Sequence, residues 1–315
     1  MRENRRRPSA SLEEALVGTR HVGFSVEQKQ HGLPSWPPPI TDRFAHEVGI
    51  PEISVNDLNA QILRDGVFSR GSIIVRGLLK GQDVDLLRHG IEQTYRHHDM
   101  ALGGAPVQDT TPWFVPFQPP NLEPGQELNR PWYREGGAEL AADSPRGLFN
   151  LIECLESNSI IDLVTAYLGE RPSLSVRKTS LRRIPCDLNA ENGWHQDGAF
   201  LGEGIRTMNL WIALSDCGVD APSMDMVPRR LDHIVPTGTE GAAFKWSVSP
   251  LEISKVCEGR EPAHLLFKAG DAIIFDEMNL HRTSTKPSMT LPRYAIEAWF
   301  FAPSCYPIDQ MPLLI

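Results

Sequence analysis

Short strand-like runs fill the second half of this 315-residue chain, and they restrict its fold more than any other feature of the sequence. The runs are rich in apolar and β-branched residues, and turn-forming residues separate them. A series of this kind is typical of a β-sandwich or a β-barrel. The runs cover residues 174–184, 194–200, 206–214, 223–227, 264–267, 272–275 and 294–302.

The first half of the chain has mainly helical spacing of its apolar residues. Ser54 suits the N-cap of a first helix, and Gly66 suits its end. Helices that precede strands favour one domain in which the helices cover one face of a closed β-structure. We therefore expect a mainly β fold with flanking helices. The predicted helices cover residues 54–65, 81–97 and 145–168, the last with a break near 157–159, and one strand is predicted over 72–77.

The predicted organisation is a single domain over residues 51–315 behind a poorly patterned N-terminal extension, residues 1–50. The helical part reaches about residue 170, and the β core covers about residues 171–302. The arginine-rich start of the extension is expected to be a solvated tail.

Composition argues against several classes of protein. The formal net charge of −9 at pH 7 disfavours a general nucleic-acid binder, and no apolar stretch is long enough to span a membrane. The five cysteines are odd in number and spaced far apart, so they form neither a disulfide framework nor a zinc ribbon. We interpret them as reduced residues of a cytoplasmic protein. The sequence leaves the oligomeric state open.

Residues 101–140 are rich in proline and carry interleaved aromatic residues. A loop of this length either wraps over the core or forms a lid or wall of a ligand pocket. The turn over 189–192 is a second candidate wall. Three cations on one predicted strand are candidates to meet an anionic substrate or cosubstrate, namely Arg177, Lys178 and Arg182.

A His195-x-Asp197 motif is the centre of the predicted chemistry. In an extended strand, residues i and i+2 point to one face, so this pair aims an imidazole and a carboxylate at one point. A second histidine would complete the two-histidine, one-carboxylate triad of non-haem Fe(II) oxygenases. His281 is the favoured third ligand, because it follows a β-branched strand at the expected rim of a barrel. His233 and His264 are interpreted as solvated or structural residues.

Arg293 lies 12 residues after His281 and begins the next predicted strand. Residues 287–292 are expected to form the turn of a hairpin, which lays the start of the second strand beside the end of the first. This arrangement places Arg293 near the metal. A guanidinium at that position suits bidentate binding of a dicarboxylate cosubstrate.

In this order the motifs resemble the phytanoyl-CoA dioxygenase family, over about residues 50–302. The chain departs from the family pattern after Pro228, where Arg229 and Arg230 replace the usual Gly-Ser pair. The resemblance implies a double-stranded β-helix core, which is a jelly-roll, cupin-like fold. The pieces that carry the resemblance are His195-x-Asp197, Leu210–Asp216, Ser223–Pro228, His281 and Arg293.

The resemblance also implies a role for each of these residues. His195, Asp197 and His281 would be the Fe(II) ligands, and Arg293 would bind the distal carboxylate of 2-oxoglutarate. Two further residues complete the implied cosubstrate site: Thr283 as a hydrogen-bonding helper and Trp211 as a lining residue.

The implied activity is that of an oxidoreductase, an Fe(II)- and 2-oxoglutarate-dependent dioxygenase that consumes O2 and releases succinate and CO2. Family relatives that halogenate have a small residue at the carboxylate position, so Asp197 favours hydroxylation, desaturation or cyclisation. The expected substrate is a small molecule such as a natural-product intermediate. Two alternatives are a cupin-like binding protein without redox activity and a metal-dependent isomerase or hydrolase. The full set of two histidines, aspartate and arginine discriminates between them, because a mere binding module does not need the arginine clamp.

Overall fold

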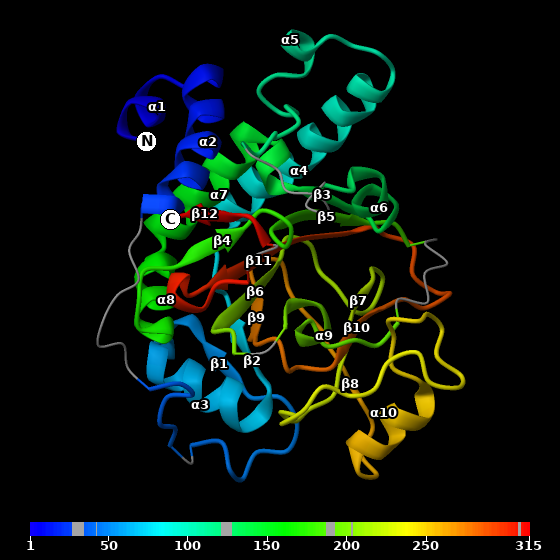
Figure 1. Cartoon of the computed structure of the whole chain (residues 1–315). Helices are drawn as coiled ribbons and strands as arrows, with labels where there is room; N and C mark the ends of the chain where they lie inside the picture. The colour runs from blue at the N-terminus through cyan, green and yellow to red at the C-terminus, as the bar shows by residue number, and fades with distance from the viewer. Residues whose placement is uncertain (27–34, 42, 121–127, 187–192, 203, 308–309) are drawn as a thin grey trace.

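The computed structural model describes residues 1–26, 35–41, 43–120, 128–186, 193–202, 204–307 and 310–315. Its strands form two facing sheets, with helices on the outer side of the larger one (Figure 1). The larger sheet has the order β1 (Glu52–Ser54), β2 (Ser72–Arg76), β9 (Ala272–Phe275), β6 (Thr207–Ala213), β11 (Arg293–Phe301), β4 (Ser173–Ser175) and β12 (Pro312–Leu314); β5 (Ser180–Ile184) also pairs with β11, and β3 (Ala138–Leu140) with β5. The smaller sheet is β10 (His281–Ser284), β7 (Ser223–Met226) and β8 (Ala263–His264).

The central strands of the larger sheet are buried on both faces, and alternate residues serve two separate cores. On β11, Trp299 and Phe301 pack in the inner core, together with Met224 and Met226 of the smaller sheet. Their neighbour Phe300 packs in the outer core, against the helices. The helices are α3 (Ala60–Arg70), α4 (Gly81–Leu102), α7 (Pro145–Ser157) and α8 (Ile160–Leu168) on the outer core, and α5 (Val107–Thr110), α6 (Arg130–Glu135), α9 (Gly198–Leu201) and α10 (Pro250–Cys257) elsewhere.

Most predicted elements are present, but the first predicted helix differs at both ends. Ser54 caps only a short 3-10 turn, and α3 begins later, where the Asn59 side chain accepts from the Ile62 amide at 3.0 Å. Gly66 does not end the helix, which continues to Arg70. A Cβ on Gly66 would lie 2.7 Å from the Ile73 Cβ. This glycine therefore allows α3 to pack closely on β2.

Two N-terminal helices replace the solvated tail that the sequence pattern predicted. They are α1 (Arg2–Arg6) and α2 (Ala10–Val26), and α2 packs against β12 and α7. The Glu13 side chain is fully buried and contacts both Asn4 and Arg146. Hydrophobic spacing missed α2 because buried polar contacts fix part of the interface. None of the described helices is both long and apolar enough to cross a membrane.

Candidate metal centre and cosubstrate site

Three potential metal ligands converge between the two sheets. One ligand atom from each of His195, Asp197 and His281 lies within 4.8 Å of the other two. The backbones of His195 and His281 form an isolated antiparallel bridge, with both N–H···O bonds at 3.0 Å. This long-range pairing places the two imidazole centroids 4.4 Å apart. The cluster is therefore built by strand pairing across 86 residues of sequence, and no local motif supplies it alone.

The backbone at Asp197 differs from the predicted strand. Extended pairing stops at His195, and Asp197 has helical angles, φ −64° and ψ −25°, directly before α9. The prediction of a strand over 194–200 is therefore wrong beyond its first two residues. The carboxylate reaches the site from the first turn of a helix, because the chain bends at Gln196.

Gln196, which the sequence analysis did not single out, holds this bend. Its side chain is buried and donates to the carbonyls of His233 at 3.0 Å and Met278 at 2.8 Å. Its amide oxygen accepts from the Val235 backbone N–H at 2.7 Å. The nitrogen and the oxygen of this side-chain amide thus both bond to the backbone of distant loops, which fixes His195 and Asp197 relative to each other.

Both histidines present the same ring nitrogen to the centre of the cluster. Nδ1 of His195 lies 2.9 Å from the Gly193 carbonyl, and Nδ1 of His281 lies 3.1 Å from the Asn279 carbonyl. A carbonyl only accepts, so Nδ1 carries the proton and Nε2 keeps its lone pair. Burial, followed by the nearby His281 ring, lowers the pKa of His195 to about 4. His195 is therefore a neutral imidazole at pH 7, which is the form that binds metal.

Asp197 completes the donor set. Its Oδ2 is buried without a hydrogen-bond partner among the described residues and lies 3.6 Å from Nε2 of His281. Its Oδ1 is paired with the Lys178 ammonium. Burial alone would raise the pKa of Asp197, but Lys178 and the two imidazoles outweigh burial and hold it well below its usual range. A buried, ionised oxygen without a donor fits a bound cation.

Arg293 is a buried cation with no carboxylate partner among the described side chains. It is 1% exposed, its Nη1 donates to the Ser223 carbonyl at 2.7 Å, and its Nε has no acceptor within the part of the chain that the structure describes. Burial, followed by repulsion from Arg182, lowers its pKa to about 9. It remains a cation at pH 7 and is suited to bind an anion that enters between the sheets.

The predicted hairpin before Arg293 is wrong. His281 and Thr283 belong to β10 of the smaller sheet, whereas Arg293 begins β11 of the larger one. The connection between them crosses from one sheet to the other. Arg293 still points into the space between the sheets, because its guanidinium reaches the Ser223 carbonyl on β7.

The remaining predicted residues divide into two groups. Trp211 is buried on β6 with its ring 5.4 Å from the Arg293 guanidinium carbon, and Thr283 is half-buried on the His281 strand. His233 is exposed and pairs with Asp232, and His264 lies between Asp225 and the Gly218 carbonyl. Both histidines therefore lie outside the cluster, as predicted.

The three predicted cations have different positions. Lys178 contacts the metal cluster through Asp197. Arg182 pairs with Glu297, which also accepts from Asn209 at 3.2 Å and from the Trp299 indole at 3.0 Å. Arg177 contributes its carbonyl, which accepts from the Tyr133 hydroxyl at 2.7 Å.

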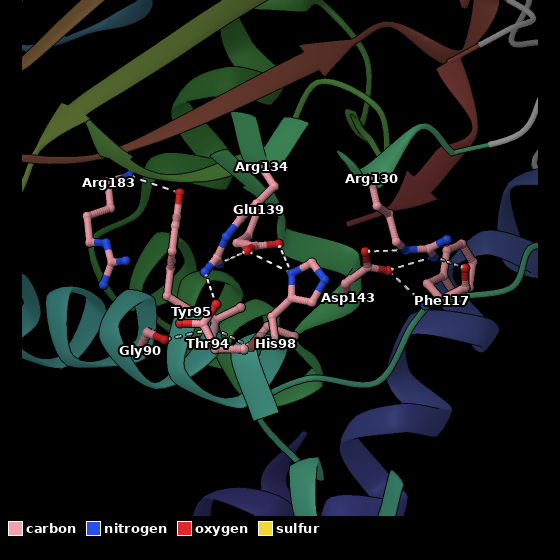
Figure 2. Close-up of polar contacts among 12 residues, drawn as sticks. Gly90, Thr94, Tyr95, His98, Phe117, Arg130, Arg134, Glu139, Asp143 and Arg183 are labelled. Carbon is pink, nitrogen blue, oxygen red and sulfur yellow. Dashed lines mark hydrogen bonds and ion pairs between the residues drawn. The ribbon is translucent and has the colours of Figure 1, made fainter. Parts of the chain in front are cut away.

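The proline-rich stretch over 101–140 includes a short helix, α6, that buried carboxylates hold in place (Figure 2). Arg130 binds Asp143 through two contacts at 2.7 and 3.0 Å. One turn later, Arg134 contacts Glu139, whose carboxylate also binds Nδ1 of His98 at 2.8 Å. These pairs fix the position of α6, and its Tyr133 reaches the carbonyl of the residue before Lys178. Residues 121–127 of this stretch, and the candidate wall at 189–192, lie outside the described residues.

Comparison with known proteins agrees with the predicted family. Residues 175–293 match the model of the family described as phytanoyl-CoA dioxygenase (PhyH). This segment contains His195, Asp197, His281 and Arg293, and the predicted resemblance is confirmed. The comparison with curated protein sequences found no match.

Among solved structures, EctD from S. alaskensis, determined with 2-oxoglutarate and 5-hydroxyectoine, is 16% identical with a TM-score of 0.51, and the alignment covers 88% of each chain. At this identity the likeness concerns the fold, and it confirms the predicted cupin-like β core with flanking helices. AviO1 from Streptomyces viridochromogenes Tue57 is 17% identical, with a TM-score of 0.47 over 76% of this chain and 93% of its own. The epimerase SnoN, determined with Fe3+, alpha ketoglutarate and nogalamycin RO, is also 17% identical, with a TM-score of 0.46 over 74% of this chain and 79% of its own.

Proposed function

We propose that this chain, whose residues 175–293 belong to the phytanoyl-CoA dioxygenase family, is an Fe(II)- and 2-oxoglutarate-dependent oxygenase. His195, Asp197 and His281 hold the iron, and Arg293 binds the distal carboxylate of 2-oxoglutarate. The observation that carries the proposal is the convergence of two Nε2 lone pairs with one carboxylate oxygen that has no hydrogen-bond partner among the described residues. Two imidazoles and one carboxylate are the donor set of non-haem Fe(II) sites.

Arg293 favours 2-oxoglutarate over the alternatives. A binding module or an isomerase that uses the metal alone gains nothing from a buried guanidinium without an anion, and burial of such a group costs free energy. A dicarboxylate supplies the missing counter-charge. Trp211, stacked beside the guanidinium, and Thr283, on the strand of His281, are the residues that would line the same cosubstrate.

When bound, Fe(II) with 2-oxoglutarate supplies the activation of dioxygen, and the protein supplies geometry and a sheltered cavity. Gln196 fixes the backbone between His195 and Asp197. The Gly193 and Asn279 carbonyls hold the ring protons of the two histidines on Nδ1. Lys178 orients the Asp197 carboxylate through Oδ1 and leaves Oδ2 free for the metal.

The reaction is hydroxylation, desaturation or cyclisation of a small molecule, rather than halogenation. Asp197 supports this outcome because its carboxylate occupies the position that halogenating relatives leave open for halide. The neighbouring α6 would form one wall of the substrate cavity, since Tyr133 contacts the strand segment that carries Lys178.

An anaerobic titration tests the proposal. Addition of Fe(II) and then 2-oxoglutarate to the purified protein should produce a weak visible charge-transfer band, the signature of a keto acid that chelates Fe(II). His281→Ala should abolish the band, because it removes one of three ligands. His264→Ala is the matched control and should retain it, since His264 lies outside the cluster. Bound iron without a band would remove 2-oxoglutarate from the proposal.

A further inference from the structure

Two aromatic rings lie beside the metal centre, a third stacks on one of them, and all three remain partly open to solvent. We name Phe200, Phe244 and Trp246 the aromatic rim. The Trp246 ring lies edge-on to the His195 ring, with centroids 5.6 Å apart, and the Phe200 ring lies 6.3 Å from it. Phe244 stacks on Trp246 at 5.0 Å with an interplanar angle of 2°. Phe200 is 44% exposed and Phe244 43%, so two of the three rings present a large part of their surface to solvent.

The turn that carries two of these rings is firmly held at its base. The Phe244 amide donates to the buried Ser247 hydroxyl at 2.9 Å, and the Val248 amide donates to the Trp194 carbonyl at 2.8 Å. Gly193 permits this contact, because a Cβ there would lie 2.4 Å from the Ser247 Cβ. Exposure of the rings is therefore built into an ordered turn, and does not result from a loosely attached loop.

The charge beside the rim restricts what can bind to it. The Lys178 ammonium lies 5.6 Å from the centroid of Phe200 and 5.7 Å from that of Trp299. Of these two rings, Phe200 belongs to the rim, and it therefore already interacts with one cation. A cationic group on the Phe200 ring would have to share that ring with Lys178, which disfavours quaternary ammonium and other cationic ligands.

We propose that the aromatic rim binds the substrate through a flat ring system, and that the bound part of the substrate carries no cationic group. Offset or edge-to-face contact of π systems gains free energy beyond the burial of area, and a puckered aliphatic skeleton does not obtain that gain. Because Trp246 touches His195, a ring seated on the rim lies next to the metal centre. The inference rests on the proposed function and specifies the substrate class of the same site.

Binding of matched probes tests the rim. The protein is loaded anaerobically with Fe(II) and 2-oxoglutarate, and the charge-transfer band verifies loading before each titration. Titration calorimetry then compares 2-naphthol with its saturated analogue, decahydro-2-naphthol, and with naphthylmethylammonium. We expect 2-naphthol to bind about tenfold more tightly than either, the effect of one or two aromatic contacts. Equal affinity for 2-naphthol and the saturated alcohol would overturn the inference.

Variants locate the binding to the rim. Phe244→Leu should reduce 2-naphthol affinity about fivefold while the charge-transfer band is kept, since Phe244 is exposed and does not touch His195. Phe200→Leu provides a second test at the other ring. Trp113→Leu is the control, because this ring packs against His89 and Arg146 on the helical side. Undiminished 2-naphthol binding in both rim variants would overturn the inference. Loss of the band in the parent protein would instead contradict the proposed function.

Discussion

Arg293 shows how a single residue is retained for function at a cost to stability. Its guanidinium is almost fully buried, and it has one carbonyl acceptor and no carboxylate partner among the described residues. The lowered pKa of Arg293 reflects the free energy of removing the charge from water. Such a group is stabilised when a ligand brings a counter-charge next to it. A charge at position 293 therefore favours binding of an anionic ligand, but it lowers the stability of the ligand-free protein.

Arg293→Leu separates the effect of this charge on ligand binding from its effect on stability. We expect the KM for 2-oxoglutarate to rise by about 10- to 100-fold, because a charge-assisted bidentate contact is lost. The free energy of unfolding of the metal-free protein should stay equal or increase, since a buried charge is removed. Succinate release and urea denaturation measure the two effects. Arg282→Leu is the control, because Arg282 pairs with Asp225 instead. An unchanged KM in Arg293→Leu would assign the clamp to another residue.

The buried carboxyl group of Glu277 predicts that the free energy of unfolding depends on pH. Burial, followed by the neighbouring Asp276, raises the pKa of Glu277 from 4.5 to about 7. Between these pH values the folded protein keeps a proton that the unfolded chain has released, so stability falls as the pH rises through this window. Glu277→Gln retains an acceptor for the Thr207 hydroxyl, which donates at 2.7 Å, and removes the ionisation.

The substitution should therefore raise the free energy of unfolding by about 1–2 kcal/mol at pH 8 and leave it nearly unchanged at pH 4.5. Urea denaturation at the two pH values measures the difference. Glu240→Gln, at an exposed position, should have no effect at either pH. An equal gain at both pH values would show that ionisation of Glu277 is not the cause.

At the scale of elements, the local sequence pattern predicted the positions of most strands, but it did not predict which strands pair with each other. Alternation and β-branched content located most strands, including β9 and β11, and motif order pointed to His281. The pattern did not show that β10 and β11 belong to different sheets, because strand pairing depends on contacts far apart in sequence. Gln196 and the aromatic rim were missed for the same reason. Their partners, such as Met278 for Gln196, come from distant loops without periodicity.

Substitution of Gly193 tests how the loop that carries Trp246 is attached to the metal-binding segment. Gly193→Ala would place a Cβ 2.4 Å from the Cβ of buried Ser247, so the turn must move away from the strand that leads to His195. We expect a loss of about 1–3 kcal/mol in the free energy of unfolding, the usual cost of overpacking. Gly81→Ala is the matched control, because nothing lies within 4 Å of its added Cβ. Equal stability of the two variants in urea denaturation would contradict this account.

At the scale of the whole molecule, the larger sheet separates the proposed site, on its inner face, from the helices that support the sheet on its outer face. Its inner face, with Trp211 and Arg293, is turned toward the smaller sheet, and its outer face packs on the helices. The N-terminal helix α2 belongs to the supporting side (Figure 1), where Arg20 donates to the Leu314 carbonyl at 2.6 Å. The division of the chain at residue 50 remains a prediction. Contacts of α2 with β12 argue that the N-terminal residues support the same fold.

This separation predicts that the N-terminal helices contribute to stability and not to metal binding. Removal of residues 1–26 exposes β12 and α7 and leaves Arg146 without Glu13. We expect a loss of about 2–3 kcal/mol, which corresponds to a decrease of several degrees in Tm. The Fe(II)–2-oxoglutarate charge-transfer band should persist at temperatures well below the lowered Tm, since the ligands lie on the other side of the larger sheet.

Removal of residues 1–8 alone is the matched control, because it deletes α1, the partly exposed pair of Arg5 with Glu153 and the Asn4 contact of Glu13, but keeps α2 and the pair of Glu13 with Arg146. Its effect on Tm should be smaller, as pairs of this kind contribute little to stability. If the longer deletion abolished the band while the Tm stayed unchanged, the N-terminal segment would have to contribute to the site directly. A lowered Tm with an intact band would place α2 among the elements that stabilise the larger sheet from outside.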